Sequence, residues 1–254
     1  MNKAAGLSAV LALTLSLITT PSARAQIQAS DIDLTRFYLR LGVSFVYPDD
    51  DATSLKYYLL QDWELYRTHW EVEEDTTWNI SAVWRPLPYA GLELLYINGA
   101  DHSLTVENFR AYPGRDFIKF GRVASSSANL FVNWYMLDDD CLAQPYLGIG
   151  VNYSDFYDDA LNSDFQHYLQ DSGISTGPAK FGMGHSWGAS AQLGIDWRLG
   201  RGRASSWMIN ASVMYTDANT DGVVTYPISP GYDRLYSDFE TNPWTLNLGV
   251  TYEF

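Results

Sequence analysis

Hydrophobic and polar residues alternate along eight segments of the chain. The clearest is the last segment, Trp244–Phe254, where apolar residues hold one parity and small or polar residues the other. A period of two residues is typical of a β-strand with one apolar and one polar face. The predicted strands are Phe37–Tyr47, Trp78–Arg85, Gly91–Ile97, Asn129–Leu137, Pro145–Ser154, Trp187–Arg198, Trp207–Thr216 and Trp244–Phe254.

Aromatic residues stand at both ends of these apolar faces, as in the pairs Trp187/Trp197 and Trp244/Phe254. At ~3.3 Å per residue and a tilt of ~40°, each pair spans about 25 Å across a membrane, the height of the apolar band of an outer-membrane barrel. A soluble β-sandwich also alternates, but it turns its apolar residues inward and does not need aromatic ends. We therefore predict an all-β fold, an eight-stranded antiparallel transmembrane β-barrel.

The outward aromatic residues are expected to form a girdle at each membrane interface. They are Trp78, Trp84, Trp134, Trp187, Trp197, Trp207, Trp244, Tyr252 and Phe254.

Connections between the predicted strands alternate between long and short. The short ones are Pro86–Ala90, Asp138–Gln144 and Leu199–Ser206, and the long ones are Pro48–Thr77, Asn98–Ala128, Phe156–Ser186 and Asp217–Asn242. Outer-membrane barrels have short periplasmic turns and longer outer loops. We expect four long extracellular loops, three short periplasmic turns and both termini in the periplasm. Within the first long loop, Ser54–Glu71 is compatible with a helix.

The first 25 residues have the pattern of a secretory signal peptide. A positive start at Met1–Lys3 precedes the apolar stretch Ala4–Thr19, and Ala23-Arg24-Ala25 supplies a small-x-small cleavage pattern. We expect residues 1–25 to be removed and residues 26–254 to form the barrel.

Composition narrows the class of partner. The chain has 254 residues and a formal net charge of −14, which argues against nucleic-acid binding because phosphate affinity needs clustered Lys and Arg. Aromatic residues make up 15% of the chain, a content that suits a membrane interface. The single cysteine, Cys141, rules out an intrachain disulfide. It is an incidental thiol in the second short turn or forms a mixed disulfide with a partner.

Parity places several apolar residues inside the barrel, where a water-filled pore would have polar walls. They are Val46, Val83, Leu95, Ile97, Phe131, Met208 and Met214. These residues would line a conduit for small hydrophobic molecules, or would merely fill a barrel whose eight strands leave room for little more than side chains.

Charged residues also face the lumen, mostly near the periplasmic end. They are Arg40, Arg85, Glu93, Asp196, Arg198 and Glu253. Charges in a narrow lumen need partners, so we expect structural salt bridges, with an ion-selectivity ring as the alternative. The four histidines show no metal-ligand spacing and no legible nucleophile–base pair. We therefore predict no metal, no cofactor and no enzyme; the rival is a lipid-modifying enzyme using His185 at the outer rim.

Several motifs together resemble the OmpW family of small outer-membrane barrels. They are Gly91–Leu95, the P-Y-x-G-x-G-x-N-Y element Pro145–Tyr153, the S-W-G-A element Ser186–Ala189, Gln192–Asp196, and the ending Asn242–Phe254. The resemblance runs from Phe37 to Phe254. It implies an eight-stranded barrel that passes small hydrophobic molecules through an apolar lumen with a lateral opening toward the bilayer. It also implies a gate formed by Leu95 and by Met214, where the family has Trp.

The expected function is passive passage of small hydrophobic molecules, with lateral release into the membrane. Outer-loop residues Tyr57, Tyr58, Trp63 and Trp70 would collect the solute. The alternative is a structural or interaction barrel with a filled, non-conducting lumen that displays its loops. Expected partners are outer-membrane lipids and lipopolysaccharide, the solutes themselves, and the barrel-assembly machinery, which would recognise the strand ending in Phe254.

Overall fold

The structure is a computed structural model that describes residues 33–49, 51–58, 63–64, 68–108, 116–138, 140–200 and 205–254. The predicted signal peptide, residues 1–25, lies outside the described residues.

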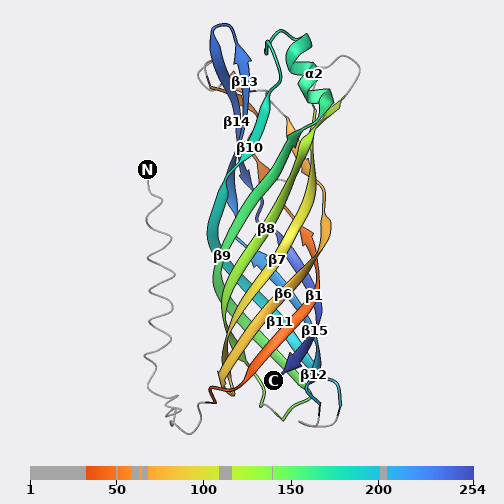
Figure 1. Ribbon diagram of the computed structural model, residues 1–254, viewed down its shortest axis with the longest axis vertical. Helices are drawn as coiled ribbons and strands as arrows, with labels where there is room; N and C mark the ends of the chain where they lie inside the picture. Colours follow the sequence, from red (N-terminus) through yellow and green to blue (C-terminus); the bar gives the residue numbers. More distant parts are fainter. Residues whose placement is uncertain are drawn as a thin grey trace. The chain divides into compact units, whose positions relative to one another are not determined.

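Eight antiparallel strands close into a barrel (Figure 1). In order around the barrel each strand pairs with the next, and the last pairs back with the first. The strands are β1 (Phe37–Tyr47), β6 (Asp75–Leu87), β7 (Ala90–Glu107), β8 (Phe117–Tyr135), β9 (Ala143–Leu161), β11 (His185–Arg198), β12 (Trp207–Thr216) and β15 (Trp244–Glu253). The predicted eight-stranded antiparallel barrel is confirmed. We call the end of the barrel with the short connections the turn end and the other the loop end.

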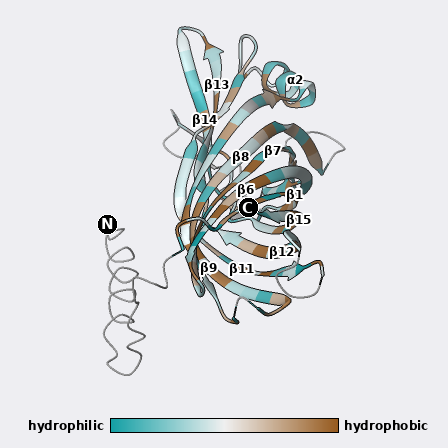
Figure 2. Ribbon diagram, turned by 60° about the horizontal axis from the view of Figure 1, so that its bottom comes forward, coloured by the Kyte–Doolittle hydropathy of each residue, from teal (hydrophilic) through white to brown (hydrophobic). Residues whose placement is uncertain are grey.

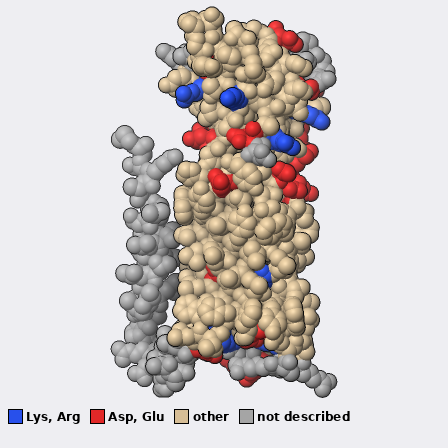
Figure 3. All heavy atoms as spheres, in the orientation of Figure 1, with Lys and Arg blue, Asp and Glu red and all other residues tan. Residues whose placement is uncertain are grey.

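The two faces of each strand have opposite surroundings, as the period of two predicts. On β1, Leu41 is 61% exposed on the outside, while Arg40 and Ser44 are buried in the lumen. The alternation of hydrophobic and hydrophilic residues is visible along the ribbon in Figure 2. Figure 3 shows a broad belt of almost only uncharged side chains between charged zones at the two ends. This belt is the surface that a bilayer would cover.

Three strands are much longer than predicted. β7, β8 and β9 continue beyond the predicted ends of these strands on the loop side. Most of the predicted loop Asn98–Ala128 is therefore strand in its described part. A bulge between Ile97 and Ala100 inserts one extra residue into β7. Residues facing inward change there from odd to even numbers, from Leu95 and Ile97 to Ala100 and His102. This change of parity breaks the period-two pattern and explains the short prediction.

A second sheet stands on the loop end. It contains β10 (Lys180–Met183), β13 (Asn219–Ile228), β14 (Gly231–Glu240), β3 (Lys56–Tyr57) and β4 (Trp63–Glu64), with β2 (Asp51–Ala52) paired to β14. The helix α2 (Ser163–Asp171) begins after Asn162, whose side chain accepts a hydrogen bond from the backbone N–H of Asp164. We call this sheet and α2 the cap. Among the described residues, no helix is long and apolar enough to cross a membrane.

The helix with which Ser54–Glu71 is compatible does not form in the described part of that segment, which contains β3, β4 and the start of β5 (His69–Val72). β5 pairs with the upper part of β7 and continues the barrel wall above β6. The cap core is aromatic: Trp70 stacks edge-on against Phe120 and Phe239, with 4.7 Å between ring centroids in each case. Long-range pairing of this segment, of β3 with β14 and of β5 with β7, therefore overrides the local helical tendency.

Candidate functional site

Two rings of aromatic side chains surround the barrel. At the loop end Trp78 packs on Tyr96, Trp187 on Tyr153 and Trp244 on Tyr215, with ring centroids 6.0, 4.9 and 5.2 Å apart. At the turn end the contacts are Phe37 with Trp84, Trp207 with Tyr252 and Tyr252 with Phe254, at 6.4, 5.0 and 5.0 Å. Trp134 and Trp197 are exposed beside the second ring. All nine predicted girdle residues thus lie on the outer face at one of these two levels, where amphipathic aromatic rings favour the membrane interface.

The lumen near the turn end is filled by an ion-paired network. Arg40 is buried between two carboxylates: its Nη1 lies 2.6 Å from Oε1 of Glu93, and its Nη2 lies 2.6 Å from Oδ2 of Asp196. Nearer the turns, Nη1 of Arg198 lies 2.6 Å from Oε2 of Glu253. Arg85 donates to the side-chain oxygen of Gln144 and lies over the ring of Tyr135, 3.7 Å from its centroid. Each buried charge thus has a compensating partner, and removal of one partner would leave the other charge buried and unpaired.

Amide and hydroxyl groups complete this layer. Glu93 also accepts hydrogen bonds from Ser81, Asn133 and Gln192, at 2.8, 2.7 and 2.9 Å. Above it, Ser44 donates to Asn247 at 2.6 Å and accepts from Asn79 at 2.7 Å. Side chains from opposite walls therefore meet, and the lower lumen is packed with side chains.

The predicted apolar lumen residues form two separate clusters. Val46, Ile97 and Phe131 share one buried cluster with Leu95, Met214 and Ala100. Val83 and Met208 lie in another with Tyr38. The first cluster brings together both residues of the expected gate, from β7 and β12.

A small cavity with a volume of about 50 Å³ lies directly above the first cluster. Val46, Ile97 and Met214 line it below, and the cap residues Met183 and Phe239 line it above. This volume is smaller than that of an ordinary small-molecule site, ~300–1,000 Å³, so a bound solute would have to displace some of the lining side chains. The cavity lies between the packed lumen and the cap core.

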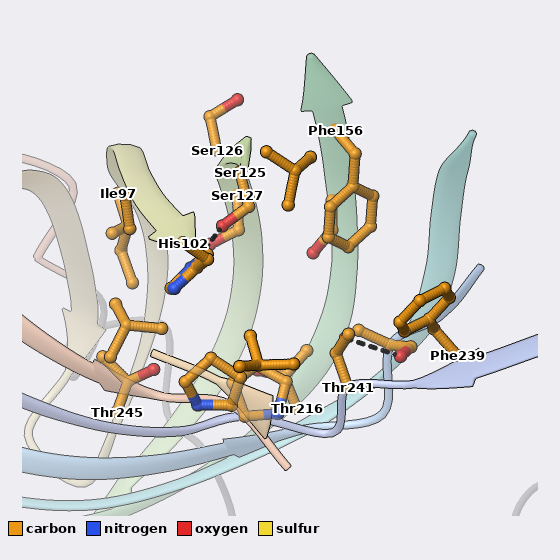
Figure 4. A pocket seen from close by; sticks show the side chains of 18 of the residues that line it. Ile97, His102, Ser125, Ser126, Ser127, Phe156, Thr216, Phe239, Thr241 and Thr245 are labelled. Atoms are coloured by element: carbon orange, nitrogen blue, oxygen red, sulfur yellow. Dashed lines mark hydrogen bonds between the residues drawn. The ribbon is translucent and has the colours of Figure 1, made fainter. Parts of the chain in front are cut away.

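One wall of the cavity is polar and contains a histidine (Figure 4). The Nδ1 atom of His102 lies 2.8 Å from the backbone carbonyl oxygen of Glu73, and its Nε2 lies 3.1 Å from Oγ of Ser125. Burial lowers the pKa of His102, against smaller opposing effects of the Glu73 carbonyl and of Asp75 and Asp101. His102 is therefore neutral at neutral pH.

A groove on the outer surface adjoins the cavity. Pro48 and Val72 line both of them, where β1 has ended at Tyr47 and β5 ends at Val72. β1 pairs with β6 only up to Val46 and Asp75, while β5 pairs with β7. Among the described strands, no pairing joins the wall at Pro48 to the wall at Val72.

The expected solute-collecting residues differ in position. Trp70 is only 3% exposed and belongs to the cap core, so the expectation that it collects solute from outside is wrong. Tyr58 is 64% exposed, and the side chains of Tyr57 and Trp63 lie outside the described part. Sequence reasoning did not single out His102, Ser125 or Thr216, which line the cavity. The sequence could have predicted that Thr216 faces the lumen, because it is the last residue of the polar face of a predicted strand. It could not predict that His102 faces inward, because the bulge in β7 changes the parity before that residue.

No metal site accompanies the cavity in the part of the chain that the structure describes: it contains no group of three or more His, Cys, Asp or Glu side chains that could hold an ion. Cys141 is a free, half-buried thiol in the turn between β8 and β9. Its backbone N–H donates to the carbonyl oxygen of Asp138 at 3.0 Å. The exposed His185 packs near the ring of Tyr153, at 5.9 Å between centroids.

The closed sheet, the apolar outer belt and the two aromatic rings define an integral β-barrel membrane protein. The model of the OmpW family matches residues 35–254, so the chain belongs to the OmpW family of outer-membrane proteins. Outer membrane protein W of Salmonella typhi is 29% identical over 195 residues, which cover 68% of this chain and 84% of that protein. Outer membrane protein W of Escherichia coli is 30% identical over 125 residues, or 49% of this chain and 51% of that protein.

Solved structures share the same fold. OprG from Pseudomonas aeruginosa superimposes with a TM-score of 0.72 at 23% identity, covering 89% of this chain and 99% of that one. AlkL, determined in lipid bilayers, gives a TM-score of 0.55 at 19% identity, covering 89% and 93%. The family and the fold locate the protein in the bacterial outer membrane.

Proposed function

We propose that the protein is a non-enzymatic conduit through which small hydrophobic molecules pass the outer surface of the outer membrane. The observation that carries this proposal is the apolar cavity above the cluster of Leu95 and Met214. An apolar solute gains by leaving water for such a cavity, at ~25 cal/mol per Å² of surface buried. The protein would thereby carry the solute past the polar lipopolysaccharide layer.

The path turns sideways in this proposal. The lower lumen is packed by the hydrogen-bonded network around Arg40 and Glu93, which favours release before that level. Pro48 and Val72 separate the cavity from the outer groove, so they are the proposed lateral exit. Met214 lines the floor of the cavity, and Leu95 belongs to the buried cluster below it, so together they would stop the solute from moving further down the lumen.

The orientation follows from the same proposal. The loop end and its cap would face the outside and contact lipopolysaccharide, while the three short connections and both termini would face the periplasm. Residues 1–25 would act as the signal peptide, and the strand ending in Phe254 would be the signal for the barrel-assembly machinery. Val83 and Met208 would then fill the periplasmic end rather than line the path.

A second candidate function is a structural barrel that displays its cap. The packed lower lumen favours it, because side chains from opposite walls meet there. This function needs no solute in the cavity.

Entry of a probe into vesicles separates the two. Vesicles with lipopolysaccharide in the outer leaflet are prepared with and without the folded protein. Entry of N-phenyl-1-naphthylamine, which fluoresces in the membrane interior, is compared with entry of glucose, measured by vesicle swelling. The conduit predicts faster entry of the hydrophobic probe alone. Equal rates with and without a barrel shown to be folded by heat-dependent gel mobility would contradict the conduit and leave the cap as the functional surface.

A further inference from the structure

The cavity contains a buried hydroxyl group without a partner. Thr216, at the end of β12, is 2% exposed and lines the cavity. Within the described residues its Oγ1 atom has no hydrogen-bond partner. An unpaired buried hydroxyl costs free energy unless something in the cavity bonds to it. Other hydroxyl groups also line the cavity, but those of Ser125, Ser154 and Thr241 each form a hydrogen bond within the protein. The unpaired hydroxyl of Thr216 is therefore the one available to a ligand.

The His102–Ser125 pair determines which hydrogen-bonding groups the polar wall offers. The carbonyl oxygen of Glu73 can only accept, so Nδ1 of His102 carries the proton and donates to it. The unprotonated Nε2 then accepts from the Ser125 hydroxyl. Ser125 is left with free lone pairs on its oxygen, and the neutral imidazole contributes no positive charge. This wall therefore suits a neutral hydrogen-bond donor better than an anion.

The negative charge near the lateral groove also disfavours anionic ligands. Glu71, Glu73 and Glu74 line the groove beside Pro48, and all three are exposed. Carboxylates at this position repel an anionic ligand. A fatty-acid anion is thus disfavoured both at the groove and inside the cavity.

We propose that the cavity selects uncharged amphiphiles, namely hydrophobic molecules that carry a hydroxyl group, and that Thr216 is the residue that recognises this group. This inference rests on the proposed function and adds the ligand class to it. The hydroxyl of the ligand pairs with the Thr216 hydroxyl beside the polar wall of His102 and Ser125, and its apolar skeleton packs on Ile97, Met214 and Phe239.

The test uses three ligands with one skeleton: 1-naphthol, naphthalene and 1-naphthoate. Binding to the full-length folded protein in detergent is measured by equilibrium dialysis against protein-free micelles, so that partition into detergent cancels. The variant is Thr216→Val, which keeps the shape and removes the hydroxyl. The matched control is Thr251→Val, because Thr251 is also buried with an unpartnered hydroxyl but does not line the cavity.

We expect Thr216→Val to weaken 1-naphthol binding about fivefold to tenfold, the effect of one lost hydrogen bond, and to leave naphthalene binding unchanged. Thr251→Val should change neither, and 1-naphthoate should not bind above the micelle control. Equal loss of 1-naphthol and naphthalene, or no loss of 1-naphthol, would overturn the role of Thr216. In those cases naphthalene binding still supports the conduit. If none of the three ligands binds to the folded wild-type protein, both the inference and the conduit are overturned.

Discussion

Arg40 on β1 reaches Asp196 on β11 across the barrel lumen, with 2.6 Å between Nη2 and Oδ2. These strands are not neighbours in the sheet, because β15 and β12 lie between them. The same guanidinium binds Glu93 on β7 at 2.6 Å. One buried cation thus connects three separate parts of the wall.

Removing that cation should be costly. Arg40→Leu leaves the carboxylates of Glu93 and Asp196 buried without their cation, and we expect a loss of about 3–5 kcal/mol in the free energy of unfolding. The measurement is urea unfolding in lipid vesicles, followed by the mobility of the folded barrel on unheated gels. The control Lys180→Gln, an exposed cation in the cap, should change the free energy by about 0.5 kcal/mol or less. An equal effect of both variants would show that the network contributes nothing specific.

Leu193 tests the position of the bilayer. It is 58% exposed on β11, between Trp187 and Trp197. In water an exposed Leu→Arg change is nearly neutral, but on the lipid face near mid-membrane it costs about 2–4 kcal/mol. We expect that cost for Leu193→Arg in the same unfolding assay. Tyr232→Arg, at an exposed position 73% accessible in the cap, should be nearly neutral. A neutral Leu193→Arg would place this surface outside the membrane.

Met214 tests the gate. Met214→Trp adds bulk at the floor of the cavity, so entry of N-phenyl-1-naphthylamine into vesicles should slow severalfold. Met208→Trp adds the same bulk to the other buried cluster, near the turn end, and should leave entry unchanged. Overpacking costs about 1–3 kcal/mol in either place, so stability alone cannot explain a difference. Unaltered entry through a folded Met214→Trp barrel would contradict the gate.

His102 makes stability depend on pH. Burial lowers its pKa in the folded protein, whereas the unfolded chain titrates near the ordinary value of ~6.5. Below that value the unfolded state binds more protons, so stability falls as pH drops from about 6.5 toward the lowered pKa, by at most about 1.4 kcal/mol per pH unit. Urea midpoints between pH 7.5 and 5 measure this slope. His102→Gln should flatten it, and His167→Gln, exposed on α2, should not. The same slope in both variants would assign the effect elsewhere.

Cys141 reports the orientation of the barrel. It is the single cysteine and lies in a short connection at the turn end. In intact cells a membrane-impermeant maleimide should not label it, but should label a Cys141→Ser/Tyr232→Cys variant at the tip of the cap hairpin. Labelling after outer-membrane permeabilisation is the control for access to Cys141. Labelling of Cys141 in intact cells would reverse the proposed orientation.

The membrane-spanning part of the fold was predictable from the sequence because one face of each strand meets lipid. The predicted bounds of β1 and β12 match the structure, and the parity of Arg40 and Met214 placed both in the lumen. Aromatic spacing identified the interfaces for the same reason. Lipid on one side of a strand and a polar lumen on the other require apolar and polar residues to alternate with a period of two. This pattern is present wherever the strand has no bulge.

The loop end was less predictable because its order depends on distant pairings. The bulge before Ala100 changes the inward parity of β7, and Trp70 is buried only because Phe120 and Phe239 come to it from β8 and β14. The helix α2 did have a local signal: Asn162 caps it, and Phe165 and Leu169 lie four residues apart on its buried face. The polar wall of the cavity needed the assembled cap to become visible.

The triad of Arg40, Glu93 and Asp196 also constrains how the barrel is assembled. Its members come from β1, β7 and β11, so its charges meet only after the sheet has curled far enough to bring those strands together. A partly inserted sheet would expose unpaired ions to hydrocarbon, at a cost of several kcal/mol. We therefore expect insertion and closure to be coupled, so that the strands cross the bilayer together rather than one hairpin at a time.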